Sequence, residues 1–456
     1  MKLDANTQDT SASGFSRDHF SREHSDHEQW IACHECDLVH TRVQVPSGQK
    51  ATCRRCGATL YRRLANSMDR ALALNLAALV LLVLSNSFPF LTLKFQGAMV
   101  ENLFISGVIR LYQMGMGEIS LLVLLTSLVF PLVNILGMIY VLLPLKLGFR
   151  PWFLAHVFGL ADALRSWSLI SVFMLGVLVS MVKLLELADI IPGVSLAAFV
   201  ALMLVMAAAH ASLDPEAVWQ RMEKKHEKSG REDEPRHPKA LPEDSVNPGA
   251  EWPTAAQLGL VSCHTCGKLL EDSGHHGQRC TRCGSGMHSR KRASLQQTWA
   301  LLVSAVVMFI PANLYPAMTM HQLGQKGVSS TILGGVIYLI EQGSSGLALI
   351  IFFASIMVPA LKLIILSGLL ISVQQGWKWR PKDRTFLFRV TEVIGAWSMV
   401  DVYVVAVLVG LVNLGLLADV RAEIGMSFFG AVVVMTMLAA MRFDPRLIWD
   451  NLERQT

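Results

Sequence analysis

Charge is scarce in this chain: Asp, Glu, Lys and Arg make up 16% of its 456 residues, whereas 52% are hydrophobic. A soluble protein of this size carries far more charge, so the composition indicates a membrane protein. The sequence contains no loop of the form G-x-x-x-x-G-K-[ST], which argues against a P-loop nucleotide hydrolase. The first thirty residues also lack the basic start and apolar core of a cleaved secretion signal, so we expect a cytosolic N-terminus.

Cysteine is absent outside one motif. All eight cysteines fall in four C-x-x-C pairs, which form knuckle 1 (Cys33, Cys36, Cys53, Cys56) and knuckle 2 (Cys263, Cys266, Cys280, Cys283). Sixteen residues separate the two pairs of knuckle 1, and thirteen separate those of knuckle 2. Two such pairs are typical of a tetrahedral site in which four thiolates hold one metal ion. We predict one structural Zn²⁺ in each knuckle, with rubredoxin-like iron as the minor alternative, and His34 and His264 as non-ligands.

Eight apolar runs are long enough to cross a bilayer, whose hydrocarbon core of roughly 30 Å needs about 20 helical residues. They cover residues 70–88, 118–143, 166–185, 194–212, 297–314, 346–372, 393–415 and 424–441. Basic residues accumulate on cytoplasmic flanks, and here they precede the first and fifth runs and fill the loop between the sixth and seventh. We therefore place both knuckles and both termini in the cytosol, where a reducing environment favours metal binding over disulfides. The same topology explains the arginines of the knuckles, so we expect no nucleic-acid partner.

The two halves of the chain repeat one another. Asn86–Pro89 matches Asn313–Pro316, Trp167 matches Trp397, and Asp214 matches Asp444. Each unit crosses the membrane an even number of times, which predicts parallel repeats. The fold class is accordingly an all-α polytopic membrane protein with two tandem four-helix transmembrane bundles, each preceded by a small cytosolic zinc-ribbon-like domain with four cysteines and joined to it. The predicted domains are a disordered segment 1–29, zinc ribbon 30–65, membrane domain 66–219, linker 220–256, zinc ribbon 257–291 and membrane domain 292–449.

Each half of the chain consists of a knuckle followed by four predicted helices. This arrangement resembles the paraquat-inducible protein A family of Gram-negative inner membranes. The likeness covers about residues 30–452 and is carried by the C-x-x-C pairs and by Arg292–Gln296, Pro311–Leu314, Ser330–Leu333, Ser355–Pro359, Trp397–Met399 with Asp401, and Phe443–Arg446 with Trp449. The resemblance implies a non-enzymatic inner-membrane subunit that works with a periplasm-spanning MCE-domain protein to move phospholipid between two membranes. Two alternatives stay open: a membrane-anchored metal or redox stress sensor, and a self-sufficient exporter of small molecules.

Ionisable groups inside a membrane are costly unless paired or hydrated, which makes each one a functional candidate. Lys362 and Asp401 are expected at similar depth, roughly 15 Å from the cytoplasmic side, on neighbouring helices. Ser398 and Thr436 would complete a polar cluster, and the shared depth of Lys362 and Asp401 would allow an ion pair between them. The cluster either fixes helix packing or couples proton movement to lipid movement through Asp401.

The repeat supplies an internal comparison for this cluster. Asn134 and Ser171 occupy the corresponding positions of the first half and are neutral. Related proteins often carry an acid where Ser171 stands, so this chain departs from that pattern, and we assign any charge-dependent coupling to the second half.

Pro131 and Pro359 lie inside the second and sixth runs, where a missing N–H predicts a kink at Ser127 and Ser355. These kinks are either functional hinges or ordinary features of membrane helices. Residues 89–117 and 317–345 are expected on the opposite side from the knuckles. They contain Val, Ile, Phe, Thr and Gly, which is consistent with short strands, and we regard them as the candidate docking surface for the periplasmic partner.

Overall fold

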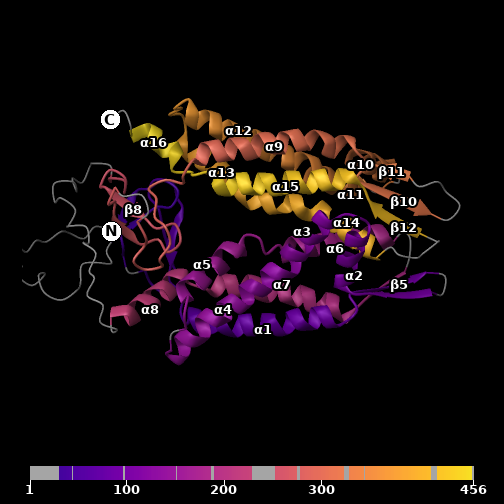
Figure 1. Ribbon diagram of the computed structural model, residues 1–456, viewed down its shortest axis with the longest axis horizontal. Coiled ribbons are helices and arrows are strands. Elements are labelled where there is room, and N and C mark those ends of the chain that lie inside the picture. The colour runs from indigo at the N-terminus through magenta and orange to yellow at the C-terminus, as the bar shows by residue number, and fades with distance from the viewer. Residues whose placement is uncertain are drawn as a thin grey trace, which may run out of the picture.

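Eight long apolar helices dominate the structure, a computed structural model (Figure 1). It describes residues 30–43, 45–95, 98–149, 151–185, 189–227, 252–274, 278–322, 328–341, 343, 345–411 and 418–453. The helices long and apolar enough to cross a membrane within these residues are Ser67–Ser87, Gly117–Leu147, Leu154–Val182, Val194–Ser212, Ser294–Leu314, Ala348–Gln374, Pro381–Gly410 and Ile424–Arg442. Segment 1–29 and most of the predicted linker lie outside the described residues.

The first half is built from α1 (Ser67–Ser87), α2 (Phe104–Gln113), α3 (Gly117–Leu124), α4 (Phe130–Leu147), α5 (Leu154–Arg165), α6 (Ile170–Leu185), α7 (Val194–Ser212) and α8 (Pro215–Glu227). The second half is built from α9 (Ser294–Leu314), α10 (Ile332–Glu341), α11 (Ser345–Phe352), α12 (Val358–Gln374), α13 (Pro381–Gly395), α14 (Val400–Leu411), α15 (Ile424–Arg442) and α16 (Leu447–Glu453). Helix α8 extends into the segment predicted as linker, because its polar residues bind knuckle 2 instead of remaining in solvent.

Each half has its own packed set of helices, and the halves are joined mainly through α14. Helix α1 packs against α4 and α7, and α4 packs against α5; in the second half α9 packs against α15 and α12, and α13 packs against α12 and α15. Between the halves, α14 packs mainly on α6 and α2. The largest cluster of buried apolar side chains accordingly contains residues of both halves.

Two spans begin about three turns earlier than their apolar runs predicted. The third span starts at Leu154 instead of 166, and the seventh starts at Pro381 instead of 393. The early turns carry charged residues, but each also presents a buried aromatic ring: Phe158 packs edge-on against Trp219, and Phe388 packs against Phe443. These turns are stabilised by packing at the knuckle end of the molecule, which a search for lipid-length apolar runs does not detect.

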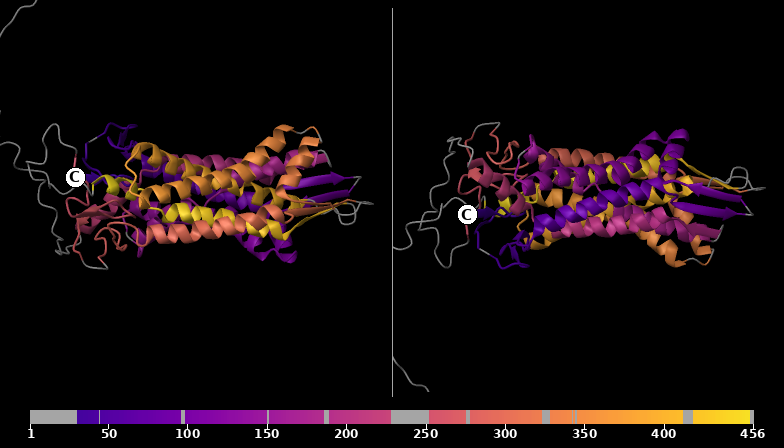
Figure 2. Two further views of the ribbon diagram at one scale, coloured as in Figure 1. Left: turned by 90° about the horizontal axis from the view of Figure 1, so that it is seen from above. Right: turned by 90° about the horizontal axis from the view of Figure 1, so that it is seen from below.

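The end opposite the knuckles carries two small antiparallel sheets (Figures 1 and 2). One sheet has the order β6 (Ala98–Asn102), β5 (Leu91–Phe95), β7 (Asp189–Pro192), and the other has the order β11 (Val328–Ser330), β10 (Met318–Gln322), β12 (Ala418–Ala422). Strands from residues 89–117 and 317–345 were predicted. The third strand of each sheet, which follows the third or seventh span, and the short helices α2 and α10 were not.

The knuckles are small β-hairpin units. Knuckle 1 contains β1 (Trp30–Ala32) paired with β2 (Val39–Thr41), and β3 (Lys50–Thr52) paired with β4 (Thr59–Arg62). Knuckle 2 contains β8 (Leu260–Ser262) paired with β9 (Leu269–Glu271). The backbone N–H of Val39 donates to Pro253 O at 3.1 Å, and that of Ala255 donates to Asp37 O at 2.9 Å. The two knuckles therefore contact one another as well as the helices.

Candidate metal centres and intramembrane polar cluster

The eight cysteines form two four-sulfur clusters. In each knuckle the four Sγ atoms lie within 4.8 Å of one another, with Cys33 to Cys56 at 3.4 Å and Cys266 to Cys280 at 3.5 Å. A disulfide would bring two sulfurs to about 2.05 Å, whereas thiolates about 2.3 Å from a tetrahedral ion stand about 3.8 Å apart. The sulfur spacing fits a metal site, so both four-cysteine groups are suited to hold one ion each.

One polar side chain contacts a cysteine sulfur in each site. His40 Nε2 lies 3.3 Å from Cys53 Sγ, and Ser285 Oγ lies 2.9 Å from Cys283 Sγ. Hydrogen bonds of this kind orient metal-bound thiolates. Sequence reasoning considered the histidines inside the motifs, His34 and His264, and overlooked His40 and Ser285. Both could have been found from the sequence, because His40 stands four residues after Cys36 and Ser285 stands two residues after Cys283.

The residue after each C-x-x-C pair has a left-handed backbone conformation, and at one of the four places this residue is not glycine. Gly57, Gly267 and Gly284 have φ between 71° and 75°, whereas Asp37 adopts φ 61° at the corresponding place in knuckle 1. A non-glycine residue is disfavoured in this conformation. Here the Asp37 carboxylate offsets that cost, because it accepts hydrogen bonds from Ala256 N at 3.2 Å and Arg290 Nη1 at 3.0 Å.

The cysteine cluster of knuckle 1 packs on the second half of the chain, whereas Arg42 and Arg62 also bind the end of the first half, at Glu216 and at the Leu213 carbonyl. Its cysteines share one apolar cluster with Leu363, Phe388 and Trp449. The Glu35 carboxylate pairs with Arg389 on α13, and the Arg55 guanidinium lies 4.5 Å from the Trp449 ring centroid.

Knuckle 2 packs in the converse way on the first half. Cys263, Cys266, Cys280 and Cys283 belong to the apolar cluster that contains Phe158 and Trp219. Arg282 pairs with Glu216 at 3.3 Å and with Glu223 at 2.6 Å, both on α8. The expectation that each ribbon joins the bundle following it in sequence is wrong for the cysteine clusters, which pack on the opposite half. Each ribbon also contacts the bundle that follows it, through Arg42 and Arg62 in the first ribbon and Arg290 and Lys291 in the second.

The crossed arrangement follows the internal repeat. The alignment that matches Trp167 with Trp397 also matches Gly159 of α5 with Arg389 of α13, and Thr265 stands at the motif position of Glu35. In one half Glu35 binds Arg389; in the other, a Cβ added to Gly159 would lie 2.9 Å from Thr265 Cγ2. Knuckle 1 therefore presents an acid to a base on the second half, whereas knuckle 2 presents the small neutral Thr265 to a glycine on the first half. Uncrossed knuckles would place Glu35 opposite Gly159 and leave Arg389 without this carboxylate.

Arg446 lies where the knuckles meet the end of the second half. It is 4% exposed, and its guanidinium contacts Asp444 Oδ1 at 3.2 Å, Asp37 Oδ1 at 3.5 Å and the His264 ring at 3.1 Å. Burial raises the pKa of Asp444, but Arg446 and the N–H of Lys291 outweigh burial and hold it below its ordinary value. Burial and Arg446 both lower the pKa of His264, so this ring is held neutral.

A second charged group holds α8 against knuckle 2. Lys268 Nζ lies 2.5 Å from Glu223 Oε1, and Arg282 binds the other carboxylate oxygen. Burial raises the pKa of Glu223, whereas Lys268 and Arg282 lower it by more, so the net shift is downward. The ionised carboxylate therefore stabilises the contact between these elements.

The structure buries Lys362 inside the membrane-spanning region beside Thr436. Lys362 is 2% exposed, and its Nζ donates to Thr436 Oγ1 at 3.0 Å. A Cβ added to Gly395 would lie 3.3 Å from the ammonium, so this glycine provides space for it. Two predicted members of the cluster are thus in direct contact, on α12 and α15.

Ser398 lies on the 3₁₀ turn before α14 and Asp401 on α14 itself, and Lys362 does not form the possible ion pair with Asp401. Within the residues that the structure describes, Lys362 bonds to Thr436 and makes no salt bridge to Asp401. The short 3₁₀ helix η6 (Ala396–Met399) separates α13 from α14 and changes the helical phase between Gly395 and Asp401. Ser398 Oγ is buried without a hydrogen-bond partner among the described residues.

The first half has a different polar contact at the corresponding depth. Asn134, the repeat counterpart of Lys362, donates to Ala161 O at 2.7 Å, and its Oδ1 lies 3.2 Å from His210 Nε2. Ser171, the counterpart of Asp401, is exposed on the surface of its helix. Sequence reasoning found Asn134 and missed His210, because a lone histidine near a helix end gives no motif.

Both predicted kink sites are distorted. A π-helical turn, η3 (Leu125–Val129) or η5 (Phe353–Met357), precedes Pro131 or Pro359, which occupies the second residue of the following helix. The missing N–H of proline is accommodated by this wider turn. The first-half turn also receives a contact from the other half, since the buried Tyr403 hydroxyl on α14 donates to Thr126 Oγ1 at 2.8 Å.

Taken together, the eight spans and the two four-cysteine clusters define a multi-pass membrane protein with two metal-binding domains at one end. The model of the family described as Paraquat-inducible protein A matches residues 68–223 and 295–453, so the chain belongs to this family.

Curated relatives match over nearly the whole chain. The chain is 36% identical to Intermembrane transport protein PqiA of Escherichia coli (strain K12) over 435 residues, covering 94% of this chain and 97% of the relative. It is 27% identical to Lipophilic envelope-spanning tunnel protein A of the same organism, over 92% and 91% of the two chains. A Haemophilus influenzae protein named Probable intermembrane transport protein is 26% identical over 93% and 97%. No solved structure matches the chain significantly.

Proposed function

We propose that the protein is a non-enzymatic inner-membrane subunit of an intermembrane lipid transport system, which exchanges phospholipid with a periplasm-spanning MCE-domain partner. The observation that carries the proposal is a buried lysine contact, Lys362 to Thr436, inside an eight-span scaffold whose relatives are named intermembrane transport proteins. A buried ammonium is costly in hydrocarbon and is retained where a pathway needs it.

The proposal places knuckles 1 and 2 and both chain ends in the cytosol, and the two sheets in the periplasm. The opposite placement of knuckles and sheets along the molecule supports this orientation (Figure 1). The family resemblance supplies the partner, and the sheets at the far end supply edge strands on which it would dock. Each knuckle would hold Zn²⁺ as a structural ion, since four thiolates close the tetrahedral shell and leave no position for chemistry.

Within this scheme the chain consists of two tandem four-helix bundles, and the second bundle carries the coupling site. Lys362, Thr436, Ser398 and Asp401 are proposed to transmit a proton while lipid moves. The buried Ser398 hydroxyl, which lacks a protein partner among the described residues, is suited to bind a water molecule between the two charged groups. The π-helical turns before Pro131 and Pro359 are proposed as the hinges.

The coupling site is tested by phospholipid transport with a reconstituted partner. Asp401→Asn and Lys362→Met are expected to reduce transport by about tenfold or more at unchanged protein level, as loss of a single proton-transfer group commonly does. Ser171→Asn, the matched change at the counterpart of Asp401, should leave transport unaltered. Normal transport by Asp401→Asn would remove the coupling proposal, and co-purification with neither an MCE-domain protein nor phospholipid would remove the transport proposal.

A metal or redox stress sensor is the second candidate function. The crossed knuckles favour it, because release of either ion would free a contact between a cytosolic domain and the opposite bundle. A sensor requires metal loss within a physiological range. Retention of both ions against chelators at micromolar free zinc, with transport intact, would reject it.

A further inference from the structure

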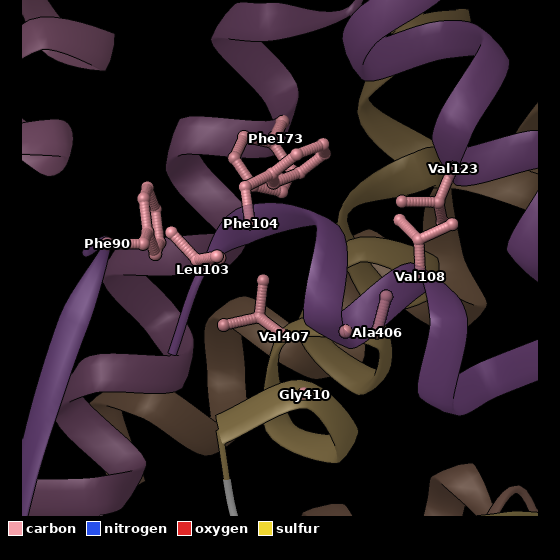
Figure 3. A pocket seen from close by; sticks show the side chains of 10 residues that line it. Phe90, Leu103, Phe104, Val108, Val123, Phe173, Ala406, Val407 and Gly410 are labelled. Carbon is pink, nitrogen blue, oxygen red and sulfur yellow. The ribbon is translucent and has the colours of Figure 1, made fainter. Parts of the chain in front are cut away.

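A narrow crevice lies between the two halves, near the end that carries the sheets. It is formed by Phe90, which lies between α1 and β5, by Leu103 and α2, by α3 and α6 of the first half, and by α14 of the second half (Figure 3). Its cavity volume is about 30 Å³. The lining residues are all apolar or glycine: Phe90, Leu103, Phe104, Gly107, Val108, Val123, Phe173, Ala406, Val407 and Gly410.

The lining decides what class of ligand the crevice accepts. No polar side chain faces it, so an ion, a headgroup or a sugar would lose its hydrogen bonds on entry. Three phenylalanine rings surround it, with Phe104 packed edge-on against Phe173 at 5.2 Å. Val123, Phe173 and Val407 belong to three membrane-spanning helices, so hydrocarbon is the medium around the crevice. Leu103 at the rim is 42% exposed, which leaves the crevice in contact with that medium.

We propose that this crevice seats the end of one phospholipid acyl chain as lipid passes between the membrane and the sheet end of the protein. The inference rests on the proposed transport function and names the part of the substrate that the protein holds. The cavity is small, so this conformation admits only the tip of a chain.

Two glycines limit the depth of the crevice. A Cβ added to Gly410 would lie 2.7 Å from Gly107 Cα, so the backbones of α2 and α14 touch there. In the repeat, the counterpart of Gly107 is Gly335 on α10, where an added Cβ would meet no atom within 4 Å. This glycine position is therefore closed on a neighbouring backbone in the first half and open in the second. Separation of Gly107 from Gly410 is the movement that would admit more of the chain.

The occupant is tested on the wild-type protein in vesicles of phosphatidylethanolamine and phosphatidylglycerol. The probe is phosphatidylethanolamine with a diazirine at the end of one acyl chain, and labelled residues are mapped by peptide mass spectrometry after illumination. Adducts are expected on Phe104 or Val407. The same lipid with its diazirine on the headgroup should leave both residues unlabelled.

Paired substitutions on one helix provide the control. Leu103→Trp, at the rim, should reduce labelling of Val407 by about tenfold, the effect of about 1.4 kcal/mol on binding. Ile109→Trp changes a residue of α2 that is 50% exposed and lies outside the crevice, and should leave labelling unchanged. Absence of chain-end adducts, equal labelling by the headgroup probe, or insensitivity to Leu103→Trp would each overturn the site.

Labelling needs neither the partner nor net transport, so the two proposals fail separately. A negative labelling result rejects the crevice and leaves the transport function standing. Loss of all transport in the reconstituted wild-type system, with labelling intact, rejects the transport function and leaves the chain-binding site.

Discussion

Removing a metal-binding thiolate from knuckle 1 should loosen the second half of the protein, although knuckle 1 precedes the first half in the chain. The substitution is Cys36→Ser, which leaves three thiolates for the ion. Metal binding supplies most of the folding free energy of such small domains, about 10–16 kcal/mol in zinc-finger peptides, so we expect knuckle 1 to unfold. Its contacts with Arg389, Trp449 and Arg446 would then be lost.

The expected magnitude follows from the most buried of these contacts. Asp37 and Arg446 have side chains 3% and 4% exposed, and removing one member of a buried ion pair costs about 3–5 kcal/mol. One factor of ten corresponds to about 1.4 kcal/mol. Amide exchange in α16 and the first turns of α13 should therefore accelerate roughly a hundredfold or more. Helix α8 would lose Arg42 but keep Arg282 and Lys268, so α8 and the first turns of α5 should keep most of their protection.

Cys266→Ser in knuckle 2 is the matched control and should act mainly on the first half, with a smaller effect on α16 through loss of the Arg290–Asp450 pair. Exchange would accelerate in α8, because Glu223 loses Arg282 and Lys268, and in α5 around Gly159. Hydrogen exchange of both variants in detergent, read by mass spectrometry, measures the two patterns side by side. If Cys36→Ser deprotected the first half alone, or if both variants gave the same pattern, the crossed packing would be refuted.

Three further predictions concern the contacts between elements. Tyr403→Phe and Thr126→Val should each destabilise the protein by about 1 kcal/mol and the double variant by less than their sum, because they share one buried hydrogen bond; additive effects in thermal unfolding would contradict this. Gly410→Ala should lower the unfolding midpoint, since its Cβ would meet the Gly107 backbone at 2.7 Å, while Gly335→Ala should not; equal effects would contradict the asymmetry. The pKa of Glu223 is lowered in the folded state, so its stabilising contribution is complete above its ordinary value of 4.5 and is lost as pH falls through the folded value. The stability difference between wild type and Glu223→Gln should thus be constant above pH 4.5 and shrink below it, and growth of the difference on acidification would exclude the assignment.

The sequence was sufficient for features that depend on local composition or spacing. The four-cysteine groups follow from motif spacing, and the eight spans follow from apolar runs, so both were predicted and both are confirmed. The π-helical distortions before Pro131 and Pro359 likewise follow from a missing backbone N–H.

Features that depend on which surfaces meet were not accessible in the same way. The sequence does not determine which half each knuckle contacts. The choice depends on pairs such as Glu35 with Arg389, which can be recognised only when the position of α13 is known. The partner of Lys362 had the same difficulty. Equal depth suggested Asp401, but η6 changes the helical phase before Asp401, and the ammonium donates to Thr436 on α15 instead. The first turns of α5 and α13 were not predicted as helix, because their apolar residues face a protein surface instead of lipid and do not extend the apolar run.

The central claim, that this protein moves phospholipid between membranes, is tested most directly by transfer between two vesicle populations. The protein is reconstituted in donor vesicles containing labelled phosphatidylethanolamine, and its MCE-domain partner bridges to acceptor vesicles. Label transfer should require both proteins and fall by about tenfold with Asp401→Asn. Transfer at the same rate without this protein would show that it does not carry the lipid.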